Sequence, residues 1–120
     1  MDKTTPPGFP QTYRKRALSV PRVTARLLKL DGWQLWGEGD TLAIEKTFHF
    51  KAYLHTLSFA NAVAFIAEQQ DHHPDMLISY RTCSIRWRSH DVAGISSRDL
   101  RCAALVDALV HPGQPRSILG

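Results

Sequence analysis

The sequence predicts a small α+β domain whose elements follow the order helix, two strands, helix, two strands, helix. Two stretches, 33–50 and 76–89, alternate apolar and polar residues with the two-residue period of strands. Each is followed by a stretch in which apolar residues recur at helical spacing, and a shorter helical stretch precedes the first. The chain has 120 residues, a length that fits one domain.

Composition and charge narrow the class of protein. Apolar residues make up 43% of the chain and charged residues 22%, which is ordinary for a globular protein. Seven basic residues and one acidic residue give residues 1–30 a charge of +6, whereas residues 31–120 carry −2. Residues 1–16 are therefore predicted to form a disordered basic arm. Such an arm can contact nucleic acid, an acidic partner or a membrane surface, but no nucleic-acid-binding motif follows it, so we expect a solvated arm.

The remaining boundaries and the cell compartment rest on simpler observations. We expect one domain over 17–112 and a flexible tail over 113–120. No stretch approaches the roughly 18 apolar residues that span a bilayer, and the N-terminus has no apolar signal-peptide core. Cys83 and Cys102 lack the spacing of a zinc finger, so both are interpreted as free thiols in a reducing compartment. We therefore expect a cytoplasmic protein without a membrane partner.

Seven elements are predicted, which in chain order are a helix at 19–31, strands at 33–36 and 41–50, a helix at 51–70, strands at 76–81 and 84–89, and a helix at 96–110. Ser19 is the candidate N-cap of the first helix and Gly32 its candidate stop. The loop 37–40 joins the first two strands as a hairpin. The second strand has an apolar face of four residues that Lys46 interrupts: Leu42, Ile44, Phe48 and Phe50.

The long helix at 51–70 is apolar on more than one side. Between Ala52 and Ala67, 12 of 16 residues are apolar. One stripe is predicted to face the core: Tyr53, Leu57, Ala60, Ala64 and Ala67. Leu54 and Phe65 point to a different sector, and a helix with a single core face needs only about 100° of apolar arc. We therefore expect a second burial surface, most simply against another subunit.

The second strand pair and the last helix complete the domain. Ile85 and Trp87 share one strand face, and Arg86 and Arg88 share the other. A turn at 91–95 follows. The last helix opens with Ser96-Ser97-Arg98-Asp99, in which Ser96 is the predicted cap and Asp99 its partner at the third position.

Three histidines bracket the second strand pair: His72 and His73 before it, and His90 after it. Imidazole gives or takes a proton near neutral pH, which suits general acid–base catalysis. Asp71 and Glu68 are close enough in sequence to orient an imidazole. Zinc also accepts three histidines, but adjacent residues diverge in direction, and no cysteine or helical His-x3-His completes a ligand set. We expect no metal.

These residues resemble the signature of a known family, the pterin-4a-carbinolamine dehydratases, in the run Glu68-x3-His72-His73-Pro74-x5-Tyr80-x9-His90-x8-Asp99. The resemblance extends upstream through Phe48-His49-Phe50 and Gly32-Trp33. Downstream it includes Ser89-His90-Asp91, Gly94 and Arg98-Asp99. It covers about residues 18–110, which is nearly all of the expected pterin dehydratase-like domain.

The resemblance implies an activity and roles for individual residues. The family dehydrates 4a-hydroxytetrahydrobiopterin to the quinonoid dihydropterin during tetrahydrobiopterin recycling, without metal or cofactor. His72 and His90 resemble its acid–base residues, and His73 resembles a catalytic and substrate-binding residue. The implied substrate-binding set also includes four further residues: Trp33 in the pterin pocket, Glu68 and Asp71 beside the imidazoles, and Arg98.

The resemblance also implies an architecture and an alternative function. The family has a four-stranded antiparallel sheet with three helices on one face. It forms dimers or tetramers, here expected through residues 51–70 and the sheet edges. Some relatives act as protein-binding modules, namely as a dimerization cofactor of a homeodomain transcription factor or as assembly factors. Degenerate relatives lose the histidines that this chain keeps, which favours catalysis.

Several conspicuous residues have simpler interpretations. Asp99 is interpreted as a helix cap rather than as a catalytic group. Tyr80 is predicted to lie on a strand and to contribute packing. His49 and His55 are expected to be structural or superficial, and His111, just before the tail, is expected to be exposed.

Overall fold

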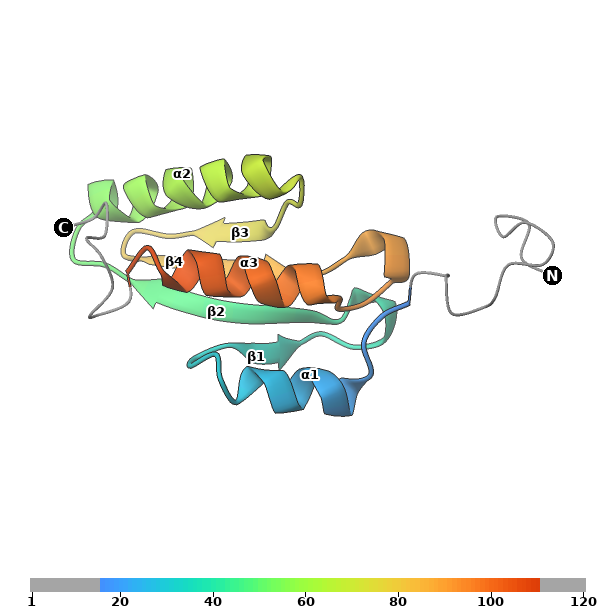
Figure 1. The fold of residues 1–120 in the computed structure, drawn as a ribbon. Coiled ribbons are helices and arrows are strands. Elements are labelled where there is room, and N and C mark those ends of the chain that lie inside the picture. Colours follow the sequence, from blue (N-terminus) through green and yellow to red (C-terminus); the bar gives the residue numbers. More distant parts are fainter. Residues whose placement is uncertain (1–15, 111–120) are drawn as a thin grey trace, which may run out of the picture.

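The computed structural model describes residues 16–110, so the predicted tail, His111 and all of the predicted arm except Arg16 lie outside it. Its elements confirm the predicted order (Figure 1). In chain order they are α1 (Val20–Leu27), β1 (Gln34–Trp36), the short 3₁₀ helix η2 (Gly39–Thr41), β2 (Ala43–His49), α2 (Tyr53–Gln70), β3 (Asp75–Ile78), β4 (Thr82–Trp87), the 3₁₀ helix η3 (His90–Val92) and α3 (Ser97–Asp107).

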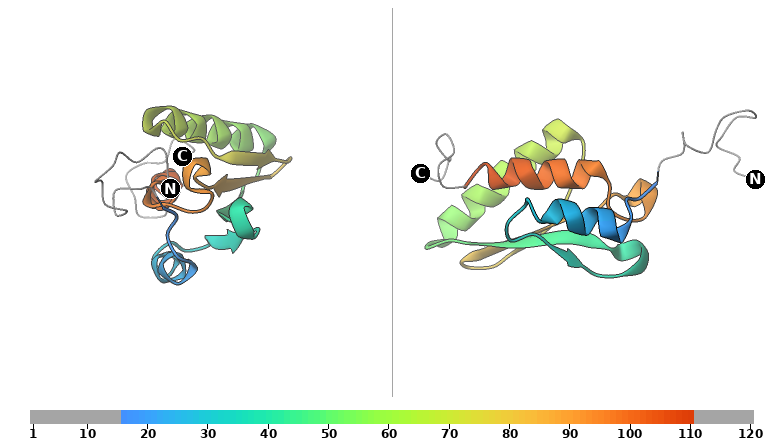
Figure 2. Two further views of the ribbon diagram at one scale, coloured as in Figure 1. Left: turned by 90° about the vertical axis from the view of Figure 1, so that its right-hand side faces the viewer. Right: turned by 60° about the horizontal axis from the view of Figure 1, so that its bottom comes forward.

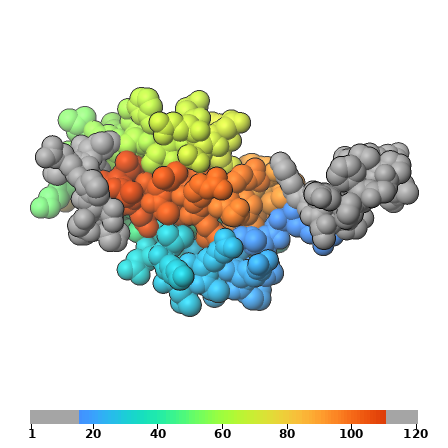
Figure 3. Space-filling view, viewed as in Figure 1, coloured from blue at the N-terminus to red at the C-terminus, as the bar shows by residue number. Residues whose placement is uncertain are grey.

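The four strands form one antiparallel sheet in the order β1-β2-β4-β3. The three α-helices lie on one face of this sheet (Figure 2), which confirms the expected architecture. In the space-filling view α3 lies between α1 and α2 (Figure 3). Within residues 16–110 no helix combines the length and the apolar character needed to cross a membrane.

The core lies between the sheet and the helices. Along β4 alternate residues are buried, and in the register of the sheet Trp87 pairs with Ile44 of β2 and Cys83 pairs with Phe48. The ring of Phe59 from α2 lies 4.6 Å from that of Phe48. Lys46 lies on the same face of β2 as Ile44 and Phe48, and its ammonium donates to a carboxylate oxygen of Asp107 at 2.9 Å. The apolar faces predicted for the strands are thus the faces that build the core.

The second strand pair differs from the prediction by about two residues. Strands were expected at 76–81 and 84–89, but the N–H of Ser79 donates to the carbonyl of Thr82 at 2.8 Å and closes a turn there. Tyr80 lies in this turn with 61% of its surface exposed, so its predicted place on a strand is wrong. The register that buries Cys83 requires β4 to begin at Thr82.

Helix ends and faces also differ in detail. The first helix was predicted to reach residue 31 but ends at Leu27, because the N–H groups of Lys29 and Leu30 donate only three residues back and tighten the last turn. In α2 the expected core residue Tyr53 is half exposed, whereas Thr56 is fully buried. Two residues expected on the outward side are exposed, at 72% for Leu54 and 66% for Phe65.

Candidate active site

His72 is placed by the way in which α2 ends. Asp71 adopts a left-handed backbone conformation, with φ 49° and ψ 45°, and its N–H donates to the carbonyl of Glu68. The N–H of His72 reaches further back, to the carbonyl of Ala67 at 3.1 Å. This pair of bonds is a Schellman motif, which satisfies the last carbonyls of a helix. The motif fixes the direction in which the chain carries His72 away from the helix.

Asp99 belongs to the first turn of α3 and is fully buried. The backbone N–H of Ser96 donates to its Oδ2 at 2.8 Å, which is one half of the predicted capping box. The hydroxyl of Ser89 donates to the same oxygen, also at 2.8 Å. One carboxylate oxygen therefore serves both the helix N-terminus and Ser89, and Oδ1 remains for another partner.

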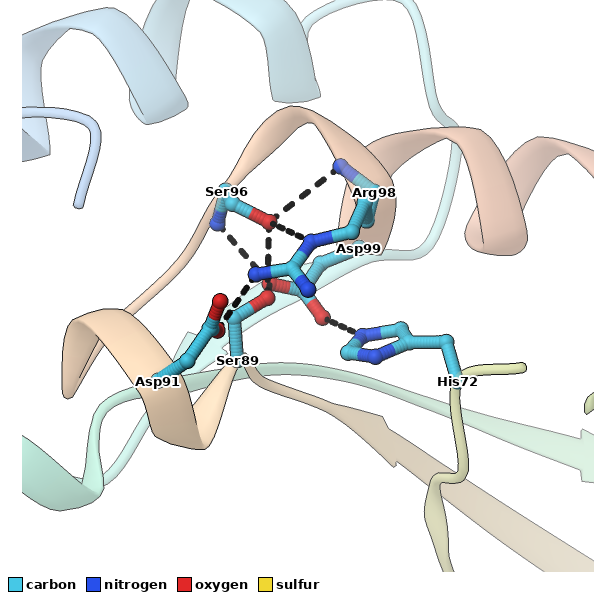
Figure 4. A network of polar contacts seen from close by, with 6 residues as sticks. All are labelled: His72, Ser89, Asp91, Ser96, Arg98 and Asp99. Carbon is cyan, nitrogen blue, oxygen red and sulfur yellow. Dashed lines mark hydrogen bonds and ion pairs between the residues drawn. The ribbon is translucent and has the colours of Figure 1, made fainter. Parts of the chain in front are cut away.

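That second oxygen of Asp99 accepts a hydrogen bond from His72 (Figure 4). The distance from Nε2 to Oδ1 is 2.5 Å, the imidazole is 8% exposed, and its ring stacks on Trp87 with centroids 5.4 Å apart. A carboxylate can only accept, so the neutral imidazole carries its proton on Nε2 and its lone pair on Nδ1. Hydrolases of the Ser-His-Asp type also orient their general base with a carboxylate, which there contacts the other ring nitrogen, Nδ1.

His73 and Glu68 form a looser pair at the surface. Their side chains are 59% and 78% exposed, and Nε2 of His73 lies 3.4 Å from Oε1 of Glu68. An exposed pair of this kind contributes little to stability. Both side chains can therefore rearrange around a bound molecule at small cost.

His90 is the first residue of η3 and is exposed. The residue before it, Ser89, is fully buried and exchanges two backbone hydrogen bonds with Gly94, at 2.7 and 3.3 Å. Since the hydroxyl of Ser89 also donates to Asp99, the backbone that carries His90 is anchored to the carboxylate that holds His72.

Arg98 lies beside this network. Its Nη2 is 2.5 Å from Oδ1 of Asp91, and its Nε donates to the hydroxyl of Ser96 at 3.2 Å. Asp71, the residue that ends α2, is exposed. The hydroxyls of Ser96 and Ser89 thus link Arg98 to Asp99, the partner of His72. The other predicted residues beside His72 lie at the end of α2, next to it in sequence: Glu68, Asp71 and His73.

Trp33 is not brought to the histidines within one chain. Its side chain is 5% exposed, and its indole N–H points at both carboxylate oxygens of Asp107, 3.1 Å from each. Asp107 follows Asp99 by eight residues, a distance of about 12 Å along a helix axis. The predicted place of Trp33 in a pterin pocket therefore stays a prediction.

The two cysteines are free and buried, and they take no part in this network. Burial raises the pKa of Cys83 from an ordinary value of 9.0 to about 11. Burial also raises the pKa of Cys102 to about 11, with a smaller contribution from the Asp99 carboxylate. Neutral thiols are poor nucleophiles and poor ligands. Within residues 16–110 no three side chains of histidine, cysteine, aspartate or glutamate are arranged to hold a metal ion.

Sequence reasoning missed the pairing of Asp99 with His72 and the role of Ser89. The capping box predicted for Asp99 is confirmed, but a carboxylate has two oxygens and the cap uses only one. The signal that could have found the pair was the position of Asp99 at the end of the histidine-containing motif. Ser89 belongs to the same motif, next to His90, but only the fold shows that its hydroxyl donates to Asp99.

Comparison with known proteins agrees with the motif. A family model described as pterin 4 alpha carbinolamine dehydratase matches residues 16–109. A protein of Paracidovorax citrulli, provisionally named pterin-4-alpha-carbinolamine dehydratase, is 53% identical over 98 residues, which are 82% of this chain and 84% of the relative. A Bdellovibrio bacteriovorus protein with the same provisional name is 42% identical over 98 residues, 78% of each chain.

Two solved structures with a similar fold are described with different roles. A transcriptional coactivator/pterin dehydratase from Brucella melitensis has a TM-score of 0.72 and 28% identity, over 78% of this chain and 97% of its own. A pterin dehydratase-like protein described as a RuBisCO assembly factor in the alpha-carboxysome has a TM-score of 0.57 and 25% identity, over 70% and 93%. The family model and the close relatives together show that this chain belongs to the pterin-4-alpha-carbinolamine dehydratase family.

Proposed function

We propose that this chain is a 4a-hydroxytetrahydrobiopterin dehydratase that works by histidine acid–base catalysis in tetrahydrobiopterin recycling. The observation that carries the proposal is the buried pair of His72 and Asp99, in a chain of the pterin dehydratase family that keeps all three histidines. The carboxylate holds the proton of the neutral imidazole on Nε2 and so leaves the lone pair on Nδ1, as a general base requires.

The proposed reaction removes one molecule of water from the pterin. The bond from C4a to the hydroxyl oxygen breaks, and its electron pair leaves with the oxygen, which receives one proton. N5 loses one proton, and the electrons of that N–H bond form the double bond between C4a and N5. The products are water and the quinonoid dihydropterin, so the reaction needs one proton donor and one acceptor and no redox partner.

The proposed roles follow from the hydrogen bonds. Nδ1 of His72 takes the proton from N5, because Asp99 holds the proton of the neutral ring on Nε2. His90, exposed on η3, delivers a proton to the departing hydroxyl. His73, with Glu68 and Asp71 beside it, contributes to binding the pterin, since these exposed groups can rearrange around it. Proton exchange with water then returns both imidazoles to their starting protonation states.

The test is a dehydratase assay in which 4a-hydroxytetrahydropterin is generated in place. His72→Ala and His90→Ala should each lower kcat strongly, by about 10²-fold or more, which is the usual contribution of general acid–base catalysis. His73→Ala should chiefly raise KM. His55→Ala is the matched control, because this exposed histidine of α2 lies outside the network. Wild-type kcat in both His72→Ala and His90→Ala would reject the proposed mechanism.

We further propose that the protein is a homo-oligomer, formed through the outward side of α2 and the edge of the sheet. Leu54 and Phe65 are large, apolar and exposed on α2, and all four residues of the edge strand β3 are exposed. The same surface supports the alternative function, a protein-binding module, since one similar structure is described as a coactivator and another as an assembly factor. A monomer at micromolar concentration in light scattering would reject the oligomer.

A further inference from the structure

A chain of polar contacts runs from η3 to His72 through the first turn of α3 (Figure 4). Arg98 donates from Nε to the hydroxyl of Ser96 at 3.2 Å, and that hydroxyl lies 2.7 Å from the hydroxyl of Ser89. Ser89 is bonded to Oδ2 of Asp99 at 2.8 Å. The other oxygen of Asp99 accepts from His72, and the other end of the chain is the ion pair of Arg98 with Asp91.

The groups at the two ends of this series of contacts, a guanidinium and a carboxylate, determine the direction of every hydrogen bond in it. A guanidinium can only donate and a carboxylate can only accept. Ser89 must therefore donate to Asp99, so its oxygen accepts from the Ser96 hydroxyl. Ser96 in turn accepts from both the Nε and the backbone N–H of Arg98. Neither hydroxyl proton in this series of contacts can point elsewhere without breaking one of these hydrogen bonds.

We propose that Arg98 is a positioning residue, which ties the η3 turn carrying His90 to the carboxylate that orients His72, and that it does not bind the pterin directly. This inference rests on the proposed function and revises the role that the family resemblance implies for Arg98. Asp91 is the residue after His90, so the ion pair of Asp91 with Arg98 restrains the backbone that carries the imidazole.

The surroundings of Arg98 support this assignment. The arginine borders a shallow depression of about 290 Å³, and its other lining residues are Arg16, Val92, Ser96 and Ser97. None of the three histidines lines this depression. Two of the donor nitrogens of Arg98 are already engaged by Asp91 and Ser96. The guanidinium of Arg98 thus points toward η3 and toward Ser96, the N-cap of α3.

The experiment compares Arg98→Gln, Asp91→Asn and their double variant with Arg101→Gln, an exposed arginine one turn along α3 that lies outside the chain of contacts. Positioning predicts that Arg98→Gln lowers kcat about tenfold, since small displacements of catalytic groups are costly, while KM and the dissociation constant of a dihydropterin stay within about twofold. The double variant should lose less than the product of the two single losses, because both single variants break the same ion pair. Arg101→Gln should behave as wild type.

A raised dissociation constant with unchanged kcat in Arg98→Gln would overturn the inference and make Arg98 a pterin ligand, while leaving the proposed function intact. Multiplicative losses in the double variant would also overturn it.

A second measurement does not depend on activity. The amides of Val92 and Ala93 are bonded within η3, and their hydrogen exchange should quicken about tenfold in Arg98→Gln, with the rest of the domain unchanged. Unchanged exchange at these amides would refute the positioning role even if the wild-type protein proved inactive, in which case the proposed function would fail separately.

Discussion

The substitution Asp99→Asn isolates the role of the buried carboxylate from its role as a helix cap. The asparagine carbonyl must replace Oδ2, because the N–H of Ser96 and the hydroxyl of Ser89 both need an acceptor there. The amide NH₂ then faces Nε2 of His72 and can only donate, so the imidazole proton moves to Nδ1. The lone pair that should accept the pterin proton is lost.

The size of the effect can be estimated from these bonds. In a Ser-His-Asp triad the same exchange lowers kcat about 10⁴-fold by selecting the wrong tautomer, and we expect a loss of about 10³-fold here for the same reason. Exchanging this charge-assisted hydrogen bond for a neutral one should lower the free energy of unfolding by about 1 kcal/mol. Stopped-flow dehydration rates measure the first quantity and urea unfolding the second.

The control for stability is Val106→Ala, which removes a fully buried side chain from the same helix. It should cost about 2 kcal/mol through lost burial and the cavity left behind, yet keep the wild-type kcat. Nitrogen-15 NMR of His72 should show the proton on Nε2 in the wild type and on Nδ1 in Asp99→Asn. An Asp99→Asn variant with wild-type kcat, or with the proton still on Nε2, would refute the reasoning.

Three further predictions concern the rest of the molecule. Burial raises the pKa of Cys83 and Cys102 to about 11, so the native state retains thiol protons that the unfolded chain loses above about pH 9. The free energy of unfolding should therefore fall as pH rises from about 9 to 11. A free energy of unfolding that urea titrations show to be constant over this pH range would contradict this. Phe65→Glu should dissociate the proposed oligomer in light scattering without altering the circular dichroism spectrum, and an unchanged oligomer mass would exclude this surface. Lys46→Met should lower the free energy of unfolding by about 1–3 kcal/mol, because it leaves the largely buried Asp107 without its cation. Wild-type stability in urea unfolding would show that Trp33 alone satisfies Asp107.

The order of elements and the core faces of the strands could be predicted because they rest on local periodicity. The alternation of Ile85 and Trp87 with Arg86 and Arg88 determines which side of β4 is buried, whatever the rest of the fold does. The ends of the second strand pair could not be predicted in the same way. They depend on the register with β2, which is a long-range property, and a shift of two residues preserves the same alternation.

The candidate site was predictable in part. The motif identified the histidines, and the end of α2 explains how His72 is placed. The bond from Asp99 to His72 joins residues 27 apart in sequence, and nothing local distinguishes a capping aspartate with a free oxygen from one with a second partner. The contact of Trp33 was likewise not predictable: its indole N–H donates to Asp107 in the last turn of α3, a partner that no spacing rule indicates.

The measurement that tests the central claim most directly is the rate of quinonoid dihydropterin formation from 4a-hydroxytetrahydropterin, with and without the protein. The wild-type protein should accelerate dehydration well above its spontaneous rate, and the double variant His72→Ala/His90→Ala should return the rate to that background while remaining folded by circular dichroism. A wild-type protein that left the spontaneous rate unchanged, or a double variant as fast as the wild type, would contradict the claim.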